Sequence, residues 1–306
     1  MVILGYRVPE LARRTMNETL EDNVLGLAAQ TAYNFFFSLF PLFLFIAPML
    51  SLFGDKERII PDLLARMSGF LPADALSLVS KVITDIAFTE SAPGLISVGA
   101  LLAAWSGSNI FTTFAHALNR AYDVTDERPW WKRRVLALAV MLGWALILIV
   151  VTGILMGGDQ ITAYARTELG LGAAATAWAI VQFPVALALL VAFLYLMYLL
   201  LPYVKQDKRH ILVGSFVAAL LFVAATLLFR LYVQNFGAYN KTYGTVGAVI
   251  MLLTWMYVVS VVILVGGELN SELHAGTGST ASLKGSVYAG RIATGEQPSQ
   301  PSSKIE

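Results

Sequence analysis

Six long apolar stretches without a charged side chain occur along the chain, separated by polar segments. They lie between Asp22 and Asp55, Glu90 and Arg120, Arg134 and Asp159, Glu168 and Lys205, His210 and Arg230, and Lys241 and Glu268. A helix needs roughly 20 apolar residues to cross a bilayer core of about 30 Å. Five stretches exceed that length, and the fifth in order reaches it when Arg230 extends toward the membrane surface. The pattern predicts an all-α polytopic membrane protein, a bundle of six transmembrane helices.

The same pattern divides the chain into three parts. Residues 1–26 are predicted to form an amphipathic N-terminal segment, 27–273 the membrane domain, and 274–306 a disordered tail rich in Gly, Ser, Thr, Gln and Pro. In the long first outer loop, apolar positions recur at helical spacing from Leu76 to Ile86, which predicts amphipathic helices there, with an interfacial spacer as the alternative. The predicted spans lie near residues 27–53, 94–119, 134–157, 176–201, 211–236 and 244–272.

Basic residues are concentrated in alternate segments between the spans. The N-terminal segment, the loops after the second and fourth spans and the tail carry 14 Lys and Arg residues, whereas the opposite segments carry six. Because the cytoplasmic loops of membrane proteins are enriched in Lys and Arg, both termini are expected to be cytoplasmic in a multi-pass protein of the bacterial inner membrane. Trp130 and Trp131, beside three basic residues, are typical of an interfacial aromatic belt.

Composition narrows the chemistry that the chain can perform. Hydrophobic residues make up 57% and charged residues 13% of the sequence, the net charge is +1 and there is no cysteine. No basic field indicates a nucleic-acid partner, and no thiolate chemistry is available. His116, His210 and His274 are too scattered for a zinc cluster, and neither a phosphate loop nor a nucleophile elbow occurs. We expect no catalytic residues, no metal and no cofactor, and therefore not an enzyme.

Polar residues recur within three of the predicted spans at steps of three and four, which places each set on one helix face. Lipid offers polar groups no hydrogen-bond partner, so these faces are expected to turn toward the bundle interior or water. One interpretation is a cytoplasm-facing polar cavity, and the alternative is an interhelical hydrogen-bond network. The candidate lining residues are Tyr33, Asn34, Ser38, Asn109, Thr113, His116, Asn119, Glu268 and Asn270.

A second group of polar residues lies near the outer end of the fifth span. Arg230 and Lys241 are candidates for contact with an anion or a lipid phosphate on that side, because Arg binds phosphate through two parallel hydrogen bonds. The alternative is that Arg230 only extends its side chain to the membrane surface.

Several motifs resemble the YihY/BrkB family of bacterial inner-membrane proteins. They are AAQTAYN at residues 28–34, LFPL at 39–42, WSGS at 105–108, ALNRAY at 117–122, YGTVG at 243–247 and GGELN at 266–270. The resemblance covers about residues 20–273 and implies six spans with a long first outer loop. Some members of this family carry the name ribonuclease BN, but the scattered histidines and the lack of a basic, aromatic RNA-binding surface argue against that activity here.

Three classes of function remain. A transporter or lipid-handling translocase would use the polar cavity, and the envelope associations of the family that the chain resembles imply lipid handling. A cation/proton exchanger would need a deep carboxylate or histidine. A non-transporting assembly or scaffold protein of the envelope is the third class. The expected partners are membrane lipids and, for the third class, other envelope proteins, but not nucleic acid.

Overall fold

The computed structural model describes residues 2–3, 6–50, 61, 64–65, 76–77, 80–81, 92–167, 172–235 and 237–275. The predicted all-α architecture is confirmed. The long helices in these ranges are α1 (Val8–Glu21), α2 (Val24–Leu50), α5 (Ala92–Ala121), α6 (Trp130–Thr167), α7 (Gly172–Leu200), α8 (Lys208–Asn235) and α9 (Gly237–Ala275). Ahead of α1, the short strands β1 (Val2–Ile3) and β2 (Tyr6–Arg7) form an antiparallel pair, with Val2 opposite Arg7 and Ile3 opposite Tyr6.

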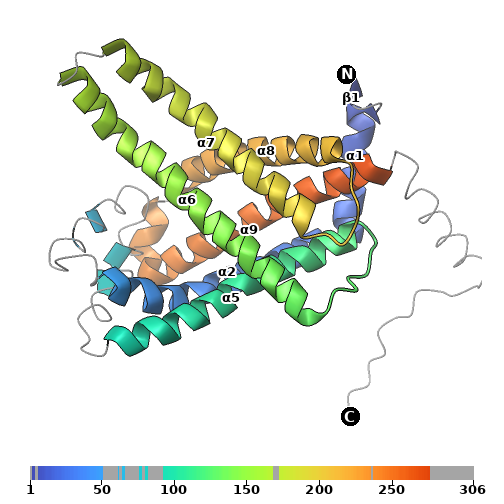
Figure 1. Ribbon diagram of the computed structural model, residues 1–306, viewed down its shortest axis with the longest axis horizontal. Coiled ribbons are helices and arrows are strands. Elements are labelled where there is room, and N and C mark those ends of the chain that lie inside the picture. The colour runs from blue at the N-terminus through green and yellow to red at the C-terminus, as the bar shows by residue number, and fades with distance from the viewer. Residues whose placement is uncertain are drawn as a thin grey trace, which may run out of the picture.

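The six long helices from α2 to α9 pack in a closed cycle that follows chain order (Figure 1). Each contacts the next, from α2 to α5 and on through α6, α7 and α8 to α9, and α9 returns to contact α2. Helix α9 also packs against α5 and α1. Residues at the C-terminal end of α9 are therefore placed where several helices meet.

Five of the helices are long and apolar enough to cross a membrane. These segments are Val24–Phe45, Trp130–Ile154, Thr176–Leu200, Lys208–Val233 and Val249–Ala275, and they coincide with the first and the third to sixth predicted spans. The predicted second span corresponds to α5, whose 30 residues would extend about 45 Å. It is less apolar than the others because polar residues run along its second half, so the count of six spans is approximate.

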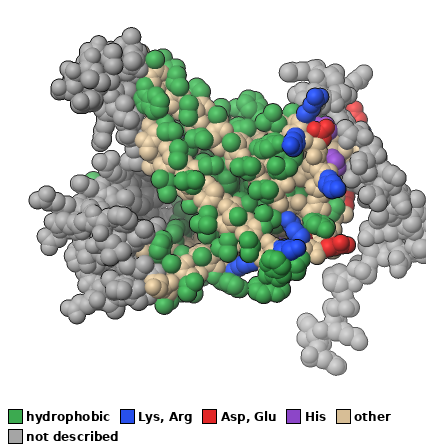
Figure 2. All heavy atoms as spheres, in the orientation of Figure 1, with side chains coloured by type: hydrophobic (Ala, Val, Ile, Leu, Met, Phe, Trp, Pro, Cys, Tyr) green, Lys and Arg blue, Asp and Glu red, His purple; other side chains and the backbone are tan. Residues whose placement is uncertain are grey.

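Charged side chains gather at one end of the bundle, whereas the sides are covered by apolar groups (Figure 2). This end carries residues 122–129 and 201–207, α1 and the C-terminus of α9, and we refer to it as the loop end. On the sides, large apolar residues such as Leu142 and Ile149 of α6 are more than 60% exposed. A soluble fold would bury such side chains, so the apolar flanks fit a lipid environment.

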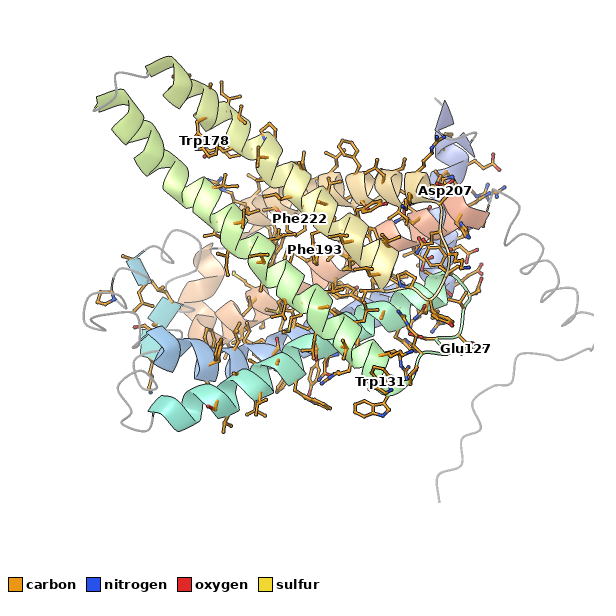
Figure 3. The ribbon with its side chains drawn as sticks, viewed as in Figure 1. Glu127, Trp131, Trp178, Phe193, Asp207 and Phe222 are labelled. Carbon is orange, nitrogen blue, oxygen red and sulfur yellow. The ribbon has the colours of Figure 1, made fainter. Side chains whose placement is uncertain are left out.

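The tightly packed core lies in the half of the bundle next to the loop end. Figure 3 shows Phe193 inside the bundle, where its ring contacts Trp144 with the ring centroids 4.4 Å apart. Small residues let α9 approach its neighbours closely. A Cβ atom at Gly266 would collide with Tyr198 and Ala218, and one at Gly267 would collide with Leu118. The glycine pair of the GGELN motif is therefore a packing surface in this structure.

Helix α1 closes the loop end of the bundle. Proline fits the first turn of a helix because no intrahelical partner is lost there, and Pro9 occupies the first turn of α1. Leu11 and Thr15 are buried at a spacing of four, and α1 contacts α9 and α2. Asn23 separates α1 from α2 with a φ of 53°, a left-handed conformation that Asn tolerates better than most residues. The turn at Asn23 thereby lets α1 leave the direction of α2.

Some predictions fall outside the described residues. They are most of the amphipathic helices expected in the first outer loop, the disordered tail beyond Ala275 and the side chain of Lys241.

Candidate functional site

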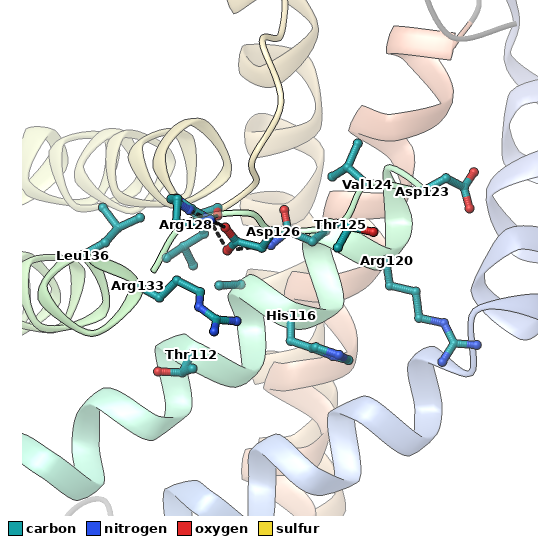
Figure 4. Close-up of a pocket in the computed structure, with 13 residues that line it drawn as sticks. Thr112, His116, Arg120, Asp123, Val124, Thr125, Asp126, Arg128, Arg133 and Leu136 are labelled. Atoms are coloured by element: carbon teal, nitrogen blue, oxygen red, sulfur yellow. Dashed lines mark hydrogen bonds and ion pairs between the residues drawn. The ribbon is translucent and has the colours of Figure 1, made fainter. Parts of the chain in front are cut away.

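A groove of about 580 Å³ opens at the loop end, between α5, the loop 122–129 and the first turns of α6 (Figure 4). Its wall combines charged, polar and apolar side chains. The lining residues are Thr112, Ala115, His116, Asn119, Arg120, Asp123, Val124, Thr125, Asp126, Arg128, Arg133, Leu136 and Leu201. The groove is therefore amphipathic, with apolar side chains such as Leu136 and Leu201 beside charged ones such as Arg128 and Arg133.

Arg128 fixes the loop that forms one wall of this groove. Its Nε and Nη2 atoms donate to the two carboxylate oxygens of Asp126 at 2.8 and 2.7 Å, and its backbone N–H donates to Asp126 at 3.0 Å. The guanidinium also donates to the carbonyls of Leu200 and Leu201 at 3.3 and 2.5 Å. These carbonyls end α7 and have no intrahelical donor. Arg128 therefore joins the 122–129 loop to the end of α7.

Asn119 supports the same wall from α5. Its Nδ2 donates to Asp126 at 3.3 Å, and its Oδ1 accepts the backbone N–H of Tyr203 at 2.6 Å. Burial alone would raise the pKa of the Asp126 carboxyl, but the hydrogen bonds and charge of Arg128 outweigh burial and lower that pKa below its ordinary value. Asp126 is accordingly ionised, and its carboxylate accepts hydrogen bonds from both Arg128 and Asn119 within the wall.

A second ion pair lies where α5 meets the α1–α2 turn. Arg120 Nε lies 3.5 Å from Asp22 Oδ1. Burial and the neighbouring charge of Asp123 raise the pKa of the Asp22 carboxyl, although Arg120 opposes that rise. Arg120 is thus paired with the Asp22 carboxylate at this side of the groove.

Two tryptophans mark the level of the groove along the bundle. Trp130 and Trp131, in the first turn of α6, are 68% and 51% exposed, and Figure 3 shows Trp131 on the outside at the loop end. The Lys132 ammonium lies 5.4 Å from the centroid of the Trp131 ring. Exposed tryptophans with adjacent basic residues are typical of the membrane–water interface. The groove therefore lies beside a pair of exposed tryptophans at the start of α6.

A separate polar network joins α2, α5 and α6 beside the groove. Asn34 donates to the Thr113 hydroxyl at 2.9 Å, and Thr113 donates to the backbone carbonyl of Asn109 at 2.9 Å. Arg134 donates to Asn109 Oδ1 at 2.6 Å and lies over the Trp105 ring, 3.7 Å from its centroid. Each of these side chains binds another helix or its own backbone, as interhelical polar contacts in membrane proteins commonly do.

A third group is buried where α9 ends among its neighbours. Glu268 is 2% exposed. Burial, followed by the charge of Glu268, raises the pKa of the nearby Tyr122 hydroxyl well above its ordinary value. Tyr122 donates to Gln206 at 2.6 Å, and the Ser271 hydroxyl donates to the Ala121 carbonyl at 2.5 Å. This cluster connects α9 to the end of α5 and to the 201–207 loop.

Comparison with known protein families gives a match over most of the chain. The family model described as virulence factor BrkB matches residues 15–286. The chain belongs to the BrkB family. The resemblance to the YihY/BrkB family that the sequence motifs indicated is thereby confirmed.

Curated relatives of this BrkB-family chain carry two kinds of name. A protein of Bacillus subtilis named putative ribonuclease-like protein YfkH is 30% identical over 248 residues, which are 81% of this chain and 89% of that protein. A UPF0761 membrane protein of Pseudoalteromonas atlantica is 25% identical over 264 residues, 84% and 83% of the two chains. One of Pseudomonas paraeruginosa is 28% identical, covering 86% of this chain and 62% of its own. No solved structure matches the chain.

The candidate lining residues of this BrkB-family chain are distributed over distinct places. His116 and Asn119 line the groove, and Asn34, Asn109 and Thr113 form the interhelical network. Glu268 and Asn270 lie buried near the end of α9. Ser38 is buried and donates to the Phe35 carbonyl, whereas Tyr33 is 59% exposed on the flank of α2. The exposed Arg230 is near the other end of α8.

Sequence reasoning did not single out Asp126, Arg128 or Arg133 as individual site residues. The available signal was the dense basic run after α5 beside two tryptophans, which was used only for orientation. Within the described ranges, no three His, Asp or Glu side chains gather in a way that could hold a metal ion.

Proposed function

We propose that this chain is a lipid-handling translocase or related transporter, and that the groove at the loop end receives the transported molecule. The supporting observation is the groove itself, which is lined by both apolar and charged side chains and lies beside the first turn of α6 that carries Trp130 and Trp131. A lipid carries the same division between an apolar and a polar part. No enzymatic step is part of this proposal, and the ribonuclease-like name belongs to the Bacillus subtilis relative.

We also propose that the loop end faces the cytoplasm of a bacterial inner membrane, with both termini on that side. Basic loops at the loop end support this orientation, since Lys and Arg are enriched in cytoplasmic loops. In this orientation the groove would draw its ligand from the cytoplasmic leaflet or from the adjoining cytoplasm. Membrane lipids are then the direct partners.

The test is to fill the groove with a bulky side chain. Leu136 lines the groove from α6, so the larger side chain of Leu136→Trp would fill part of its volume. Leu142→Trp is the matched control, because Leu142 lies on the same helix and is 63% exposed to the lipid side. The purified full chain would be reconstituted in liposomes, and the movement of a fluorescent phospholipid between leaflets would be followed. We expect Leu136→Trp to slow this movement and Leu142→Trp to leave it unchanged; equal rates for both variants would reject the role of the groove.

A cation/proton exchanger remains the second candidate, and the burial of Glu268 favours it. Buried carboxylates in membrane proteins commonly carry protons, and Glu268 is 2% exposed at a junction of helices. The same liposomes distinguish the two functions when a pH gradient is applied. Proton flux that disappears in Glu268→Gln, with no movement of lipid in the unmodified chain, would favour the exchanger.

A further inference from the structure

Arg133 differs from the other basic residues around the groove. Arg128 is held by Asp126 and the end of α7, and Arg120 is paired with Asp22. The backbone N–H of Arg133 donates to the Pro129 carbonyl at 3.3 Å. In the part of the chain that the structure describes, its side chain makes no hydrogen bond or ion pair, although it lines the groove. The charge of Arg133 lowers the pKa of the Asp126 carboxyl, but both oxygens of that carboxylate already accept hydrogen bonds from Arg128. The guanidinium of Arg133 is therefore available to bind a ligand in the groove.

The groove that Arg133 lines also holds both polar and apolar groups. His116 lines the groove from α5 and is exposed, and in Figure 4 the Arg133 side chain extends from α6 toward the side of α5 that carries His116 and Thr112. Leu136, one turn further along α6, lines the same groove. The positive group thus lies at the level of the exposed tryptophans, and the apolar surface continues along α6 toward the middle of the membrane.

We propose, resting on the translocase function proposed above, that Arg133 and His116 bind the phosphate of a phospholipid headgroup while Leu136 contacts the adjoining acyl chain. Guanidinium groups bind phosphate oxygens through two parallel charge-assisted hydrogen bonds, and an imidazole N–H adds a further donor. The apolar lining residues Leu136 and Leu201 favour a lipid rather than a free phosphate as the source of this group. A soluble phosphate ester would share the headgroup chemistry but would leave these apolar side chains without a contact.

The experiment measures binding without transport. The purified full chain in a neutral maltoside detergent would be titrated with short-chain phosphatidylglycerol, and tryptophan fluorescence would report binding near Trp130 and Trp131. Arg133→Gln removes the proposed phosphate contact. Lys132→Gln is the matched control, since it removes the same charge one position away at a residue that lies over Trp131 and does not line the groove.

We expect Arg133→Gln to raise the dissociation constant at least about tenfold, as the loss of a charge-assisted contact does. Lys132→Gln should change it less than about twofold. Diacylglycerol, which has the same chains without phosphate, should bind more weakly than phosphatidylglycerol by a similar factor. Because Arg133 has no partner to lose, melting curves of Arg133→Gln should match those of the unmodified chain.

Competition with glycerol phosphate distinguishes the two sources of the phosphate. Failure of millimolar glycerol phosphate to displace the lipid supports a headgroup site, whereas displacement supports a soluble phosphate ester in the same site. Equal weakening by Arg133→Gln and Lys132→Gln, or equal affinity for diacylglycerol, would overturn the proposal. Equal rates for Leu136→Trp and Leu142→Trp in liposomes would reject a role of the groove in translocation, whereas the effect of Arg133→Gln on lipid binding in detergent is measured separately, so the two failures can be told apart.

Discussion

The contact between Arg128 and Asp126 provides a sharp test of how the groove wall is held. Arg128→Gln removes both guanidinium bonds to the carboxylate and both bonds to the end of α7. The loss of one partner of a buried ion pair costs about 3–5 kcal/mol, whereas an exposed pair contributes about 0–1 kcal/mol. The side chains of Arg128 and Asp126 are 16% and 9% exposed, between these limits but nearer the buried one. We therefore expect a loss of about 2–3 kcal/mol in the free energy of unfolding.

A double-mutant cycle separates the ion pair from the contacts with α7. Asp126→Asn leaves the two carbonyl bonds of Arg128 in place, so it should cost less than Arg128→Gln. The coupling energy between the two sites should reach about 1–2 kcal/mol. Glu127→Gln is the control, since Glu127 is exposed between them and should change stability by no more than about 0.5 kcal/mol. Denaturation of the detergent-solubilised chain gives all four values, and a loss in Arg128→Gln no larger than in Glu127→Gln would refute the reasoning.

The same pair predicts a dependence on pH with a defined sign. The pKa of the Asp126 carboxyl is lower in the folded chain than its ordinary value. A depressed carboxyl pKa stabilises the folded state above the unfolded pKa, and this contribution is lost as the pH falls through the folded value. The difference in free energy of unfolding between the unmodified chain and Arg128→Gln should therefore be largest at neutral pH and should decrease below about pH 4. A difference in free energy of unfolding that stays constant below about pH 4 would mean that the Asp126 carboxylate is not involved.

Two further predictions concern packing and orientation. Gly214→Ala would drive a Cβ into the side chain of Asn270 and should destabilise the chain by about 1–3 kcal/mol, as measured by thermal melting. Gly143→Ala is the control, because a Cβ there meets nothing within 4 Å and should be neutral or slightly stabilising. Similar melting of the two variants would contradict the close contact between α8 and α9. In intact cells, an impermeant thiol reagent should label Ser77→Cys but not Ser279→Cys, and labelling of the second would reverse the proposed orientation.

The sequence predicts the helices well because apolar length is a strong and local signal. The span predicted at 176–201 and the segment Thr176–Leu200 agree to within one residue at each end. The signal is weakest for α5, where Asn109, His116 and other polar residues dilute the apolar run that still forms one 30-residue helix. Hydropathy measures composition, and α5 keeps its helical form because its polar side chains find partners on α2, α6 and its own backbone.

The arrangement of the candidate site could not be predicted in the same way. Periodicity assigns residues to one face of a helix, but it does not say which neighbour that face meets. His116 and Thr113 are three positions apart on α5, yet His116 is exposed in the groove while Thr113 bonds Asn34 of α2. Glu268 faces a third environment beside Tyr122. The convergence of helix faces is a property of the tertiary packing, which depends on small residues such as Gly266 and Gly267 that carry no polar signal of their own.

The basic run after α5 illustrates why charge alone could not locate the groove. A count of Lys and Arg treats its members as equivalent, because each contributes the same charge to membrane orientation. The folded chain gives each a different neighbour: Arg128 binds Asp126, Lys132 lies over Trp131, and Arg134 lies over Trp105. Arg133 is left facing the groove because the helical turn of α6 points its neighbours elsewhere. The proposed orientation and the proposed lipid site thus use the same basic run, and only the proposed site depends on the register of α6 against α5.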